Sequence, residues 1–210
     1  MRGRFLTLEG GEGAGKTTLI KTLKDWLSGQ GIDVVVTREP GGTPGAEVLR
    51  DILLNGSTDR WSPVTEALLM YAARVDHVER LIEPALARGA WVISDRFSDS
   101  TRAYQGVAGG VSADRIQKIH AAALGGFYPD LTLILDLDPK VGLARTVARG
   151  EDATRFERFD TSFHDRLRQA FLDIAAEDPD RCQVLDALDA PDLVAEKAIA
   201  AIETRLGAPA

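Results

Sequence analysis

The residues with the clearest chemical potential lie near the start of the chain, where glycines precede a lysine and two threonines. Gly10-x-x-x-x-Gly15-Lys16-Thr17 matches the phosphate-binding P-loop pattern at every fixed position. Glycines let a backbone turn tightly and direct its N–H groups inward, and the helix predicted from Lys16 adds its positive end. Lys16 is expected to lie along the β- and γ-phosphates of a nucleotide, and the Thr17 hydroxyl to hold Mg²⁺. The alternative is a ligand-free glycine turn, but the order strand, glycines, Lys-Thr and helix favours a phosphate site.

A second acidic group for a nucleotide–Mg²⁺ site has two candidates, because two predicted strands end in Asp95 and Asp136. Asp136 leads into Asp138, which is expected to cap the next helix, so that strand end has a structural explanation. Asp95 is followed directly by Arg96. A carboxylate beside a guanidinium can orient Mg²⁺-bound water while the arginine binds a phosphate, so the sequence favours Asp95 and Arg96.

Two polar, glycine-containing stretches, 38–43 and 149–158, are either ordinary surface loops or binding elements. The first follows the second predicted strand, at the sheet edge where doubly wound folds bind ligands. The second carries three arginines. Asn-Lys-x-Asp and Asp-x-x-Gly, the signatures of a GTPase, are missing. Transfer of a phosphoryl group between two anions needs closely spaced positive charge, which four arginines are placed to supply: Arg38, Arg50, Arg74 and Arg96.

Apolar strand-like runs alternate with amphipathic helical patterns, which predicts an α/β fold with a parallel sheet. The predicted strands are Phe5–Glu9, Asp33–Thr37, Trp91–Asp95, Leu131–Leu137 and Gln183–Leu185. The predicted helices are 16–28, 45–54, 63–88, 112–124, 139–148, 161–176 and 191–206. No repeat or linker interrupts this pattern, so residues 1–210 are expected to form one domain.

Composition narrows the function classes. With 44% hydrophobic residues the chain can build a full core, and a net charge of −7 argues against a nucleic-acid binder. The lone cysteine, Cys182, fits a reducing compartment and a buried position. The three histidines lack metal-ligand spacing, and no apolar run reaches transmembrane length. We expect a cytoplasmic protein that does not bind membranes.

Five further motifs, in this order after the P-loop, resemble the thymidylate kinase (dTMP kinase) family in its bacterial form. They are Arg38-Glu-Pro-Gly-Gly-Thr43, Tyr71-Ala-Ala-Arg74, Asp95-Arg-Phe97, Asp99-Ser-Thr-x-Ala-Tyr-Gln-Gly106 and Pro129-Asp-Leu-Thr-x-x-Leu-Asp136. The resemblance runs from Leu8 to about Asp186. It implies a three-layer P-loop kinase fold with five parallel strands, and transfer of the γ-phosphoryl of ATP to dTMP, giving dTDP and ADP for dTTP synthesis.

The resemblance also implies where the acceptor binds. Arg96 and Arg50 are expected to hold the dTMP phosphate, a dianion suited to paired guanidinium groups. Arg74 is expected to donate to a thymine carbonyl, with Thr101 and Gln105 at the remaining polar edge of the base. Arg38 and Pro40 belong to the same expected dTMP site, and the family suggests a cis peptide before Pro40.

Two further acceptor contacts are implied. Tyr104 is expected against the sugar, where a 2′-hydroxyl would clash. Glu12 is expected to accept from the 3′-hydroxyl or from Mg²⁺-bound water, the alternative being a solvated loop carboxylate. The family usually has an aromatic residue four positions before the base-reading arginine, where this chain has Met70 beside Tyr71. Methionine packs on a ring through its sulfur but less rigidly, so the stacking residue stays open between the two.

The bacterial form of the family also supplies an arginine from a mobile lid, which 149–160 resembles. We expect Arg155 to stabilise the transferring phosphoryl group, with Arg149 next and stacked on adenine, while Arg158 is a solvated charge. A homodimer through 63–88 and 112–124 is implied as well. The expected ATP site comprises Gly10, Gly11, Glu12, Gly13, Ala14, Gly15, Lys16, Thr17, Thr18 and Arg149, with Thr17 and Asp95 (through water) at the metal.

Two alternatives remain at this point. One is a related kinase that phosphorylates dUMP or a deoxynucleoside, since the methyl group of thymine adds only about a kcal/mol of contact. The other is a nucleotide-dependent switch without catalysis, which the missing switch motif and the arginine-rich loop disfavour.

Overall fold

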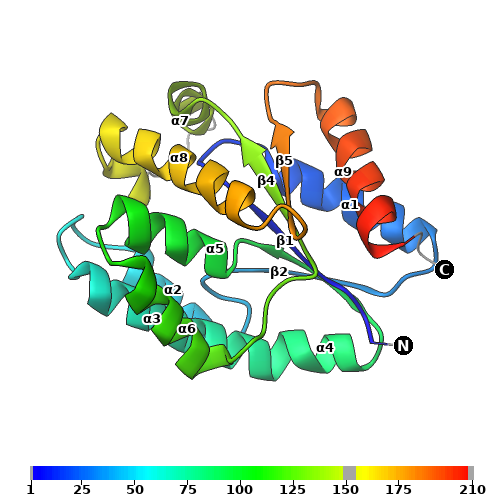
Figure 1. Ribbon diagram of the computed structural model, residues 1–210, viewed down its shortest axis with the longest axis horizontal. Helices are drawn as coiled ribbons and strands as arrows, with labels where there is room; N and C mark the ends of the chain where they lie inside the picture. Colours follow the sequence, from blue (N-terminus) through cyan, green and yellow to red (C-terminus); the bar gives the residue numbers. More distant parts are fainter. Residues whose placement is uncertain (1, 149–154, 208–210) are drawn as a thin grey trace.

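The computed structural model describes residues 2–148 and 155–207, and these form a single five-stranded sheet surrounded by helices (Figure 1). The strands are β1 (Phe5–Gly10), β2 (Val34–Arg38), β3 (Trp91–Asp95), β4 (Leu131–Asp136) and β5 (Cys182–Asp186). The longer helices are α1 (Lys16–Gly29), α2 (Pro44–Leu54), α3 (Pro63–His77), α6 (Ala113–Leu124), α7 (Pro139–Ala148), α8 (Thr161–Glu177) and α9 (Pro191–Leu206). The short segments are η1 (Val78–Ile82), α4 (Glu83–Ala87), α5 (Ser98–Thr101), η2 (Arg102–Ala108) and η3 (Phe156–Arg158). No helix of the described chain is long and apolar enough to span a bilayer.

The sheet is parallel throughout, with strand order β2-β3-β1-β4-β5. The predicted α/β class and five parallel strands are therefore confirmed. The residues of β1 are fully buried, because β1 has a strand on either side and helices on both faces. The carboxyl ends of β1, β2 and β3 lie side by side, which is where parallel sheets bind ligands.

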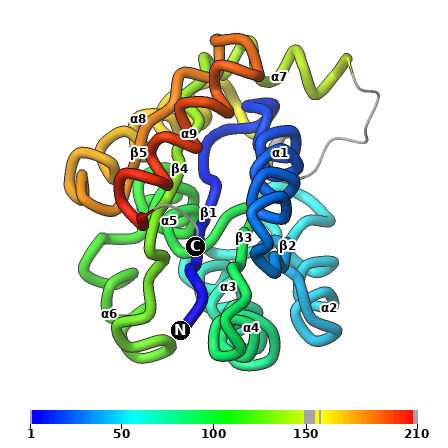
Figure 2. The backbone as a smooth tube through the Cα atoms, turned by 90° about the vertical axis from the view of Figure 1, so that its right-hand side faces the viewer, coloured from blue at the N-terminus to red at the C-terminus, as the bar shows by residue number. Residues whose placement is uncertain are grey.

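Helices cover both faces of the sheet (Figures 1 and 2). On one face, α1 and α9 pack on each other and on the strands through an aliphatic core. On the other face, α8 packs on β1, β4, β5 and η2, and α4 packs on β3. The two phenylalanine-rich clusters on this second face include Phe5 with Phe97 and Tyr104 with Phe171.

The largest difference from the predicted elements is at 63–88, where one long helix was expected. The backbone stays helical but widens to π-type turns over η1, just before Pro84, which has no N–H to donate. A second π-type stretch, η2, follows the short helix α5. The sequence analysis predicted no helix between 98 and 108, because that polar segment lacks the apolar spacing of an ordinary helix.

Glu9, a fully buried carboxyl group in β1, ties the central strand to the start of α5. Its Oε1 accepts from the backbone N–H groups of Phe97 (2.8 Å) and Ser100 (3.2 Å), and the Ser100 hydroxyl lies 2.6 Å from Oε2. Burial raises the pKa of Glu9 to about 7, although Arg96 and the hydrogen bonds lower it. The segment that follows β3 is therefore held in place by a carboxyl group that easily takes up a proton.

Arg155, the arginine expected to act from the lid, is bound to its neighbours in the fold. Its side chain is 1% exposed, and it donates from Nε to the carbonyl of Leu53 (3.0 Å), from one terminal nitrogen to the carbonyl of Thr58 (3.0 Å) and from the other to the Glu66 carboxylate. Its guanidinium also lies over the ring of Phe156. These bonds hold Arg155 on α2, on α3 and on the loop between them, and its role beside the phosphates stays a prediction. Arg149 lies outside the described residues.

The first prediction concerns Glu9 and pH. The pKa of Glu9 is about 7 in the folded protein and near 4.5 in the unfolded chain. Between pH 4.5 and pH 7 its carboxyl group is therefore mostly protonated in the folded state and mostly ionised in the unfolded state. The contribution of Glu9 to the free energy of unfolding therefore falls as pH rises from about 4.5 to 7 and is constant outside that window. In Glu9→Gln the side chain cannot ionise. In urea unfolding, the free energy of unfolding of the variant minus that of the wild type should therefore increase by ~3 kcal/mol as pH rises across this window. A difference that does not change with pH would contradict the assignment.

The second prediction concerns Arg155. Arg155→Ala removes the charged partner of the buried Glu66 carboxylate and the donor to two carbonyl groups, so it should lower the free energy of unfolding by ~3 kcal/mol. Arg166→Ala is the control, because Arg166 is exposed on α8 and its removal should change stability by less than about 0.5 kcal/mol. Near-wild-type stability of Arg155→Ala, together with a large loss of turnover, would contradict this structural role and support the lid role.

Candidate active site

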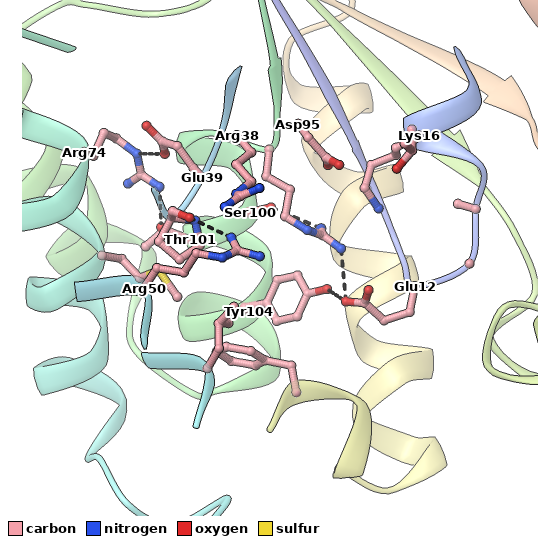
Figure 3. A pocket seen from close by; sticks show the side chains of 18 of the residues that line it. Glu12, Lys16, Arg38, Glu39, Arg50, Arg74, Asp95, Ser100, Thr101 and Tyr104 are labelled. Atoms are coloured by element: carbon pink, nitrogen blue, oxygen red, sulfur yellow. Dashed lines mark hydrogen bonds and ion pairs between the residues drawn. The ribbon is translucent and has the colours of Figure 1, made fainter. Parts of the chain in front are cut away.

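A cavity of about 320 Å³ opens at the carboxyl ends of β1, β2 and β3 (Figure 3). The P-loop forms one wall, and the loops after β2 and β3, together with α2, α3, α5 and η2, form the others. Most of the expected site residues line this cavity: Glu12, Gly13, Ala14, Gly15, Lys16, Thr17, Thr18, Arg38, Pro40, Arg50, Met70, Arg74, Asp95, Arg96, Thr101, Tyr104 and Gln105.

The P-loop packs so closely on its neighbours that two positions require glycine. Gly10 has φ of 128°, and a Cβ there would lie 2.4 Å from the carbonyl oxygen of Leu135 in β4. Gly13 has φ of 67°, and its Cβ would lie 2.2 Å from the carbonyl oxygen of Gly142 in α7. Side chains are excluded at both positions by backbone that cannot move aside.

Lys16 is the first residue of α1 and is buried at the cavity wall. Its Nζ donates to the carbonyl oxygens of Gly10 (3.3 Å) and Gly11 (3.0 Å), and burial lowers its pKa. No side chain of the described residues caps this helix, whose N-cap Gly15 has φ of 93°. The N–H groups of the first turn and the lysine are therefore available to an anion.

Arg96 joins the end of β3 to the P-loop. Its backbone has φ of 72°, the left-handed conformation that non-glycine residues rarely adopt. One terminal nitrogen donates to the carbonyl oxygen of Gly10 (2.9 Å) and the other to Oε1 of Glu12 (3.0 Å). Burial opposes its charge, but Tyr104, Glu12 and Asp95 raise the pKa of Arg96. The guanidinium is a fixed cation at the meeting point of both halves of the cavity.

Glu12 is not a solvated loop carboxylate. Its Oε1 accepts from the Tyr104 hydroxyl (2.6 Å) as well as from Arg96 (Figure 3). Burial alone would raise the pKa of Glu12, but Arg96 and Lys16 outweigh burial and lower it to about 2. Glu12 is therefore ionised and can only accept hydrogen bonds.

The loop after β2 supplies the next wall. The peptide between Glu39 and Pro40 is cis, as the resemblance suggested. Arg50, on α2, donates to the carbonyl oxygen of Pro40 (2.7 Å) and points into the cavity (Figure 3). Arg38 lines the cavity too, but its side chain is half exposed and paired with Glu47 (3.1 Å). Of these two arginines, Arg50 is the more firmly positioned.

The structure separates the two candidates for a ring-contacting residue. Met70 lines the cavity, whereas Tyr71 does not and directs its hydroxyl to Nδ1 of His120 (3.2 Å). The ring of Tyr71 lies against the guanidinium of Arg74, 4.6 Å from ring centre to Cζ. Met70 therefore occupies the cavity wall, and Tyr71 supports Arg74 from behind.

Thr101 and Gln105 line the cavity but are already engaged. The Thr101 hydroxyl accepts from Arg74 (3.1 Å), and the Gln105 amide donates to Glu66 (2.6 Å), the same carboxylate that binds Arg155. The carbonyl oxygen of the Gln105 amide remains as an acceptor.

Four cavity residues were missed by the sequence analysis: Glu39, Leu54, Ser100 and Phe156. Glu39 and Ser100 lie inside motifs that had been singled out, so a carboxylate between Arg38 and Pro40 was a usable signal. Phe156 carried no signal, because its place depends on the packing of its ring against Tyr104, 5.3 Å between ring centres. The described residues contain no cluster of three or more acidic, histidine or cysteine side chains able to hold a metal ion.

Comparison with known proteins points to one family. The thymidylate kinase family model matches residues 8–198. The chain is 56% identical to a thymidylate kinase of Caulobacter vibrioides over 98% of this chain and 99% of the relative. It is 50% identical to a thymidylate kinase of Bradyrhizobium diazoefficiens over 98% of this chain and 91% of that relative. It is also similar to the crystal structure of thymidylate kinase from Ehrlichia chaffeensis, with a TM-score of 0.79 and 33% identity over 96% of this chain and all of that one.

The P-loop, the motifs that follow it and the fold thus agree with the matches over nearly the whole chain. The chain belongs to the thymidylate kinase family.

Proposed function

We propose that this chain, as one domain over 1–210, transfers the γ-phosphoryl of ATP to dTMP, giving dTDP and ADP for dTTP synthesis in the cytoplasm. The observation that carries the proposal is the shared cavity: the P-loop and an acceptor wall rich in arginine face each other across it. Phosphoryl transfer needs donor and acceptor in line with their charges neutralised, and one cavity meets both needs.

The donor phosphates lie on residues 10–18. The free N–H groups of the first turn of α1 bind them, and Lys16 exchanges its carbonyl partners for the β- and γ-phosphates. The buried lysine is already fixed at the wall, so little side-chain freedom is lost on binding.

The acceptor phosphate lies between Arg96 and Arg50. Both guanidinium groups donate to backbone carbonyls, which leaves other N–H groups for a dianion. Arg38 and Pro40 complete this wall. Because an ionised phosphate already bears the attacking oxygen, no general base is required.

The nucleoside of the acceptor lies between α3 and η2. Arg74 donates to a carbonyl of the base, Met70 packs on the ring, and Thr101 and Gln105 lie at its polar edge. Tyr104 lies against the sugar, where a 2′-hydroxyl would clash, and the ionised Glu12 accepts from the 3′-hydroxyl. Apart from Glu12, which is partly exposed, all of these side chains are buried, and this supports the arrangement.

The residues present fit a Mg²⁺–nucleotide complex. Oδ1 of Asp95 is buried without a hydrogen-bond partner among the described residues, and Thr17 lines the same cavity. Thr17 and Asp95, the latter through water, hold the ion, which neutralises charge on the phosphates when bound. For the lid, Arg155 is the first candidate to stabilise the transferring group and Arg149 the second; Arg155 has to release Leu53 and Glu66 to do so.

The acceptor is tested by the release of ADP from Mg²⁺-ATP. Turnover should be highest with dTMP and ~10-fold lower in kcat/KM with dUMP, which lacks only the methyl group. Thymidine and the mixture without acceptor should give ADP near background. Release that does not depend on an acceptor would mean an ATPase or switch, and a preference for thymidine would mean a nucleoside kinase.

The proposal includes a homodimer formed through α3 and α6. Leu68 on α3 is 52% exposed, an apolar side chain on the surface of that helix. Sedimentation at micromolar concentration should give twice the chain mass for the wild type and the chain mass for Leu68→Lys. Leu188→Lys is the matched control, because Leu188 is 62% exposed but lies between β5 and α9. A monomeric wild type would overturn this part.

A further inference from the structure

The donors of Arg74 are divided between the protein and the cavity. Its side chain is 2% exposed. Nε donates to Oε2 of Glu39 (2.6 Å), and one terminal nitrogen donates to the carbonyl oxygen of Phe97 (3.1 Å) and to the Thr101 hydroxyl (3.1 Å). The other terminal nitrogen, Nη1, is buried and has no partner within residues 2–148 and 155–207. Since a buried donor without a partner is costly, we infer that Nη1 donates to an acceptor atom of a ligand.

Arginine stays protonated in proteins and its guanidinium has no acceptor atom, so Nη1 can bind only to an acceptor. In a pyrimidine this distinguishes a ring carbonyl from an amino group at the same carbon. The discrimination depends on the guanidinium not turning, because a rotated side chain would offer other contacts. Tyr71 and Phe97 pack on the guanidinium, 4.6 and 5.2 Å from ring centre to Cζ, but they do not fix rotation in its plane.

The Glu39 carboxylate supplies that constraint, and His77 in turn fixes the carboxylate. His77 lies three residues after Arg74 on α3, and it is 0% exposed. Its Nδ1 is 3.0 Å from Oε1 of Glu39, so the two α3 residues hold one carboxylate oxygen each. The backbone N–H of Glu39 also donates to the carbonyl oxygen of Asp95 (2.9 Å). The carboxylate thus has no freedom to follow a moving arginine.

The other ring nitrogen of His77 is fixed as well. Nε2 lies 2.7 Å from the Thr37 hydroxyl, inside β2. The loop after β2 closes over this pair: Gly42 has φ of 92°, and a Cβ there would lie 2.5 Å from both Nε2 of His77 and the Thr37 hydroxyl. Every polar atom of the imidazole is therefore used, and the packing around it leaves no room for another orientation.

We propose that His77, acting through Glu39, is a positioning residue for substrate choice. It holds Arg74 so that only Nη1 faces the acceptor base, which selects a pyrimidine with a carbonyl at the contacted ring carbon over one with an amino group there. This inference rests on the proposed function, because it assumes that the acceptor base lies against Arg74. His77 itself does not touch the substrate.

The test compares dUMP with dCMP, whose bases differ at C4, which bears a carbonyl or an amino group, and in the hydrogen on the adjoining N3. The wild type should prefer dUMP in kcat/KM by at least ~100-fold. In His77→Leu, which keeps bulk but removes both hydrogen bonds, this ratio should fall about 10-fold or more, through a higher KM for dUMP with the KM for ATP unchanged. His77→Asn retains a donor toward Glu39 and should recover most of the ratio.

Ile202→Ala is the control for lost stability. Ile202 is fully buried between α9 and α1, on the opposite face of the sheet, so its variant should unfold more easily with the dUMP-to-dCMP ratio intact. An unchanged ratio in His77→Leu would overturn the inference. If that variant does not fold, Thr37→Val should lower the ratio several-fold, and an unchanged ratio there would overturn it equally. A wild type that phosphorylates neither dTMP nor dUMP would instead mean that the proposed function is wrong.

Discussion

The contact on which the site depends is the one between Arg96 and the P-loop. The guanidinium binds the Gly10 carbonyl and the Glu12 carboxylate at once, and it thereby joins the end of β3 to the end of β1. This requires the left-handed backbone at Arg96, an unfavourable conformation that the surroundings must impose. Glu9 does so by accepting from the N–H of Phe97, the next residue. The acceptor wall is placed relative to the P-loop by these few bonds.

Two carboxyl groups three residues apart take opposite roles around that arginine. Glu9 is sealed in the sheet, and burial raises its pKa to about 7. Glu12 lies at the cavity with its side chain 21% exposed, and Arg96 and Lys16 lower its pKa to about 2. Near neutral pH the first is therefore divided between its protonated and ionised forms, and the second is an anion. A bound phosphate then meets a cation that is already partly balanced, which limits the cost of burying it.

The fold and most of the cavity were predictable because they follow from local patterns. Alternating apolar runs predicted the five strands, and the glycine spacing located the phosphate site. What the sequence did not reveal depends on long-range packing. The neighbours of Arg155 along the chain gave no sign that acceptors on α2, on α3 and in the loop between them bind it. His77 looked like an isolated histidine until α3 and β2 brought it against Glu39.

The most direct test of the account is a double-mutant cycle on Arg96 and Glu12, measured as kcat/KM for dTMP with saturating Mg²⁺-ATP. Arg96→Lys keeps a charge but replaces the two terminal nitrogens that reach Gly10 and Glu12 separately by one ammonium nitrogen, and Glu12→Gln removes the anion. If the two act as one unit, each single variant should lose at least ~100-fold, and the double variant should lose little more than the worse of the two. Losses that simply multiply in the double variant would contradict the claim that this pair joins the two halves of the site.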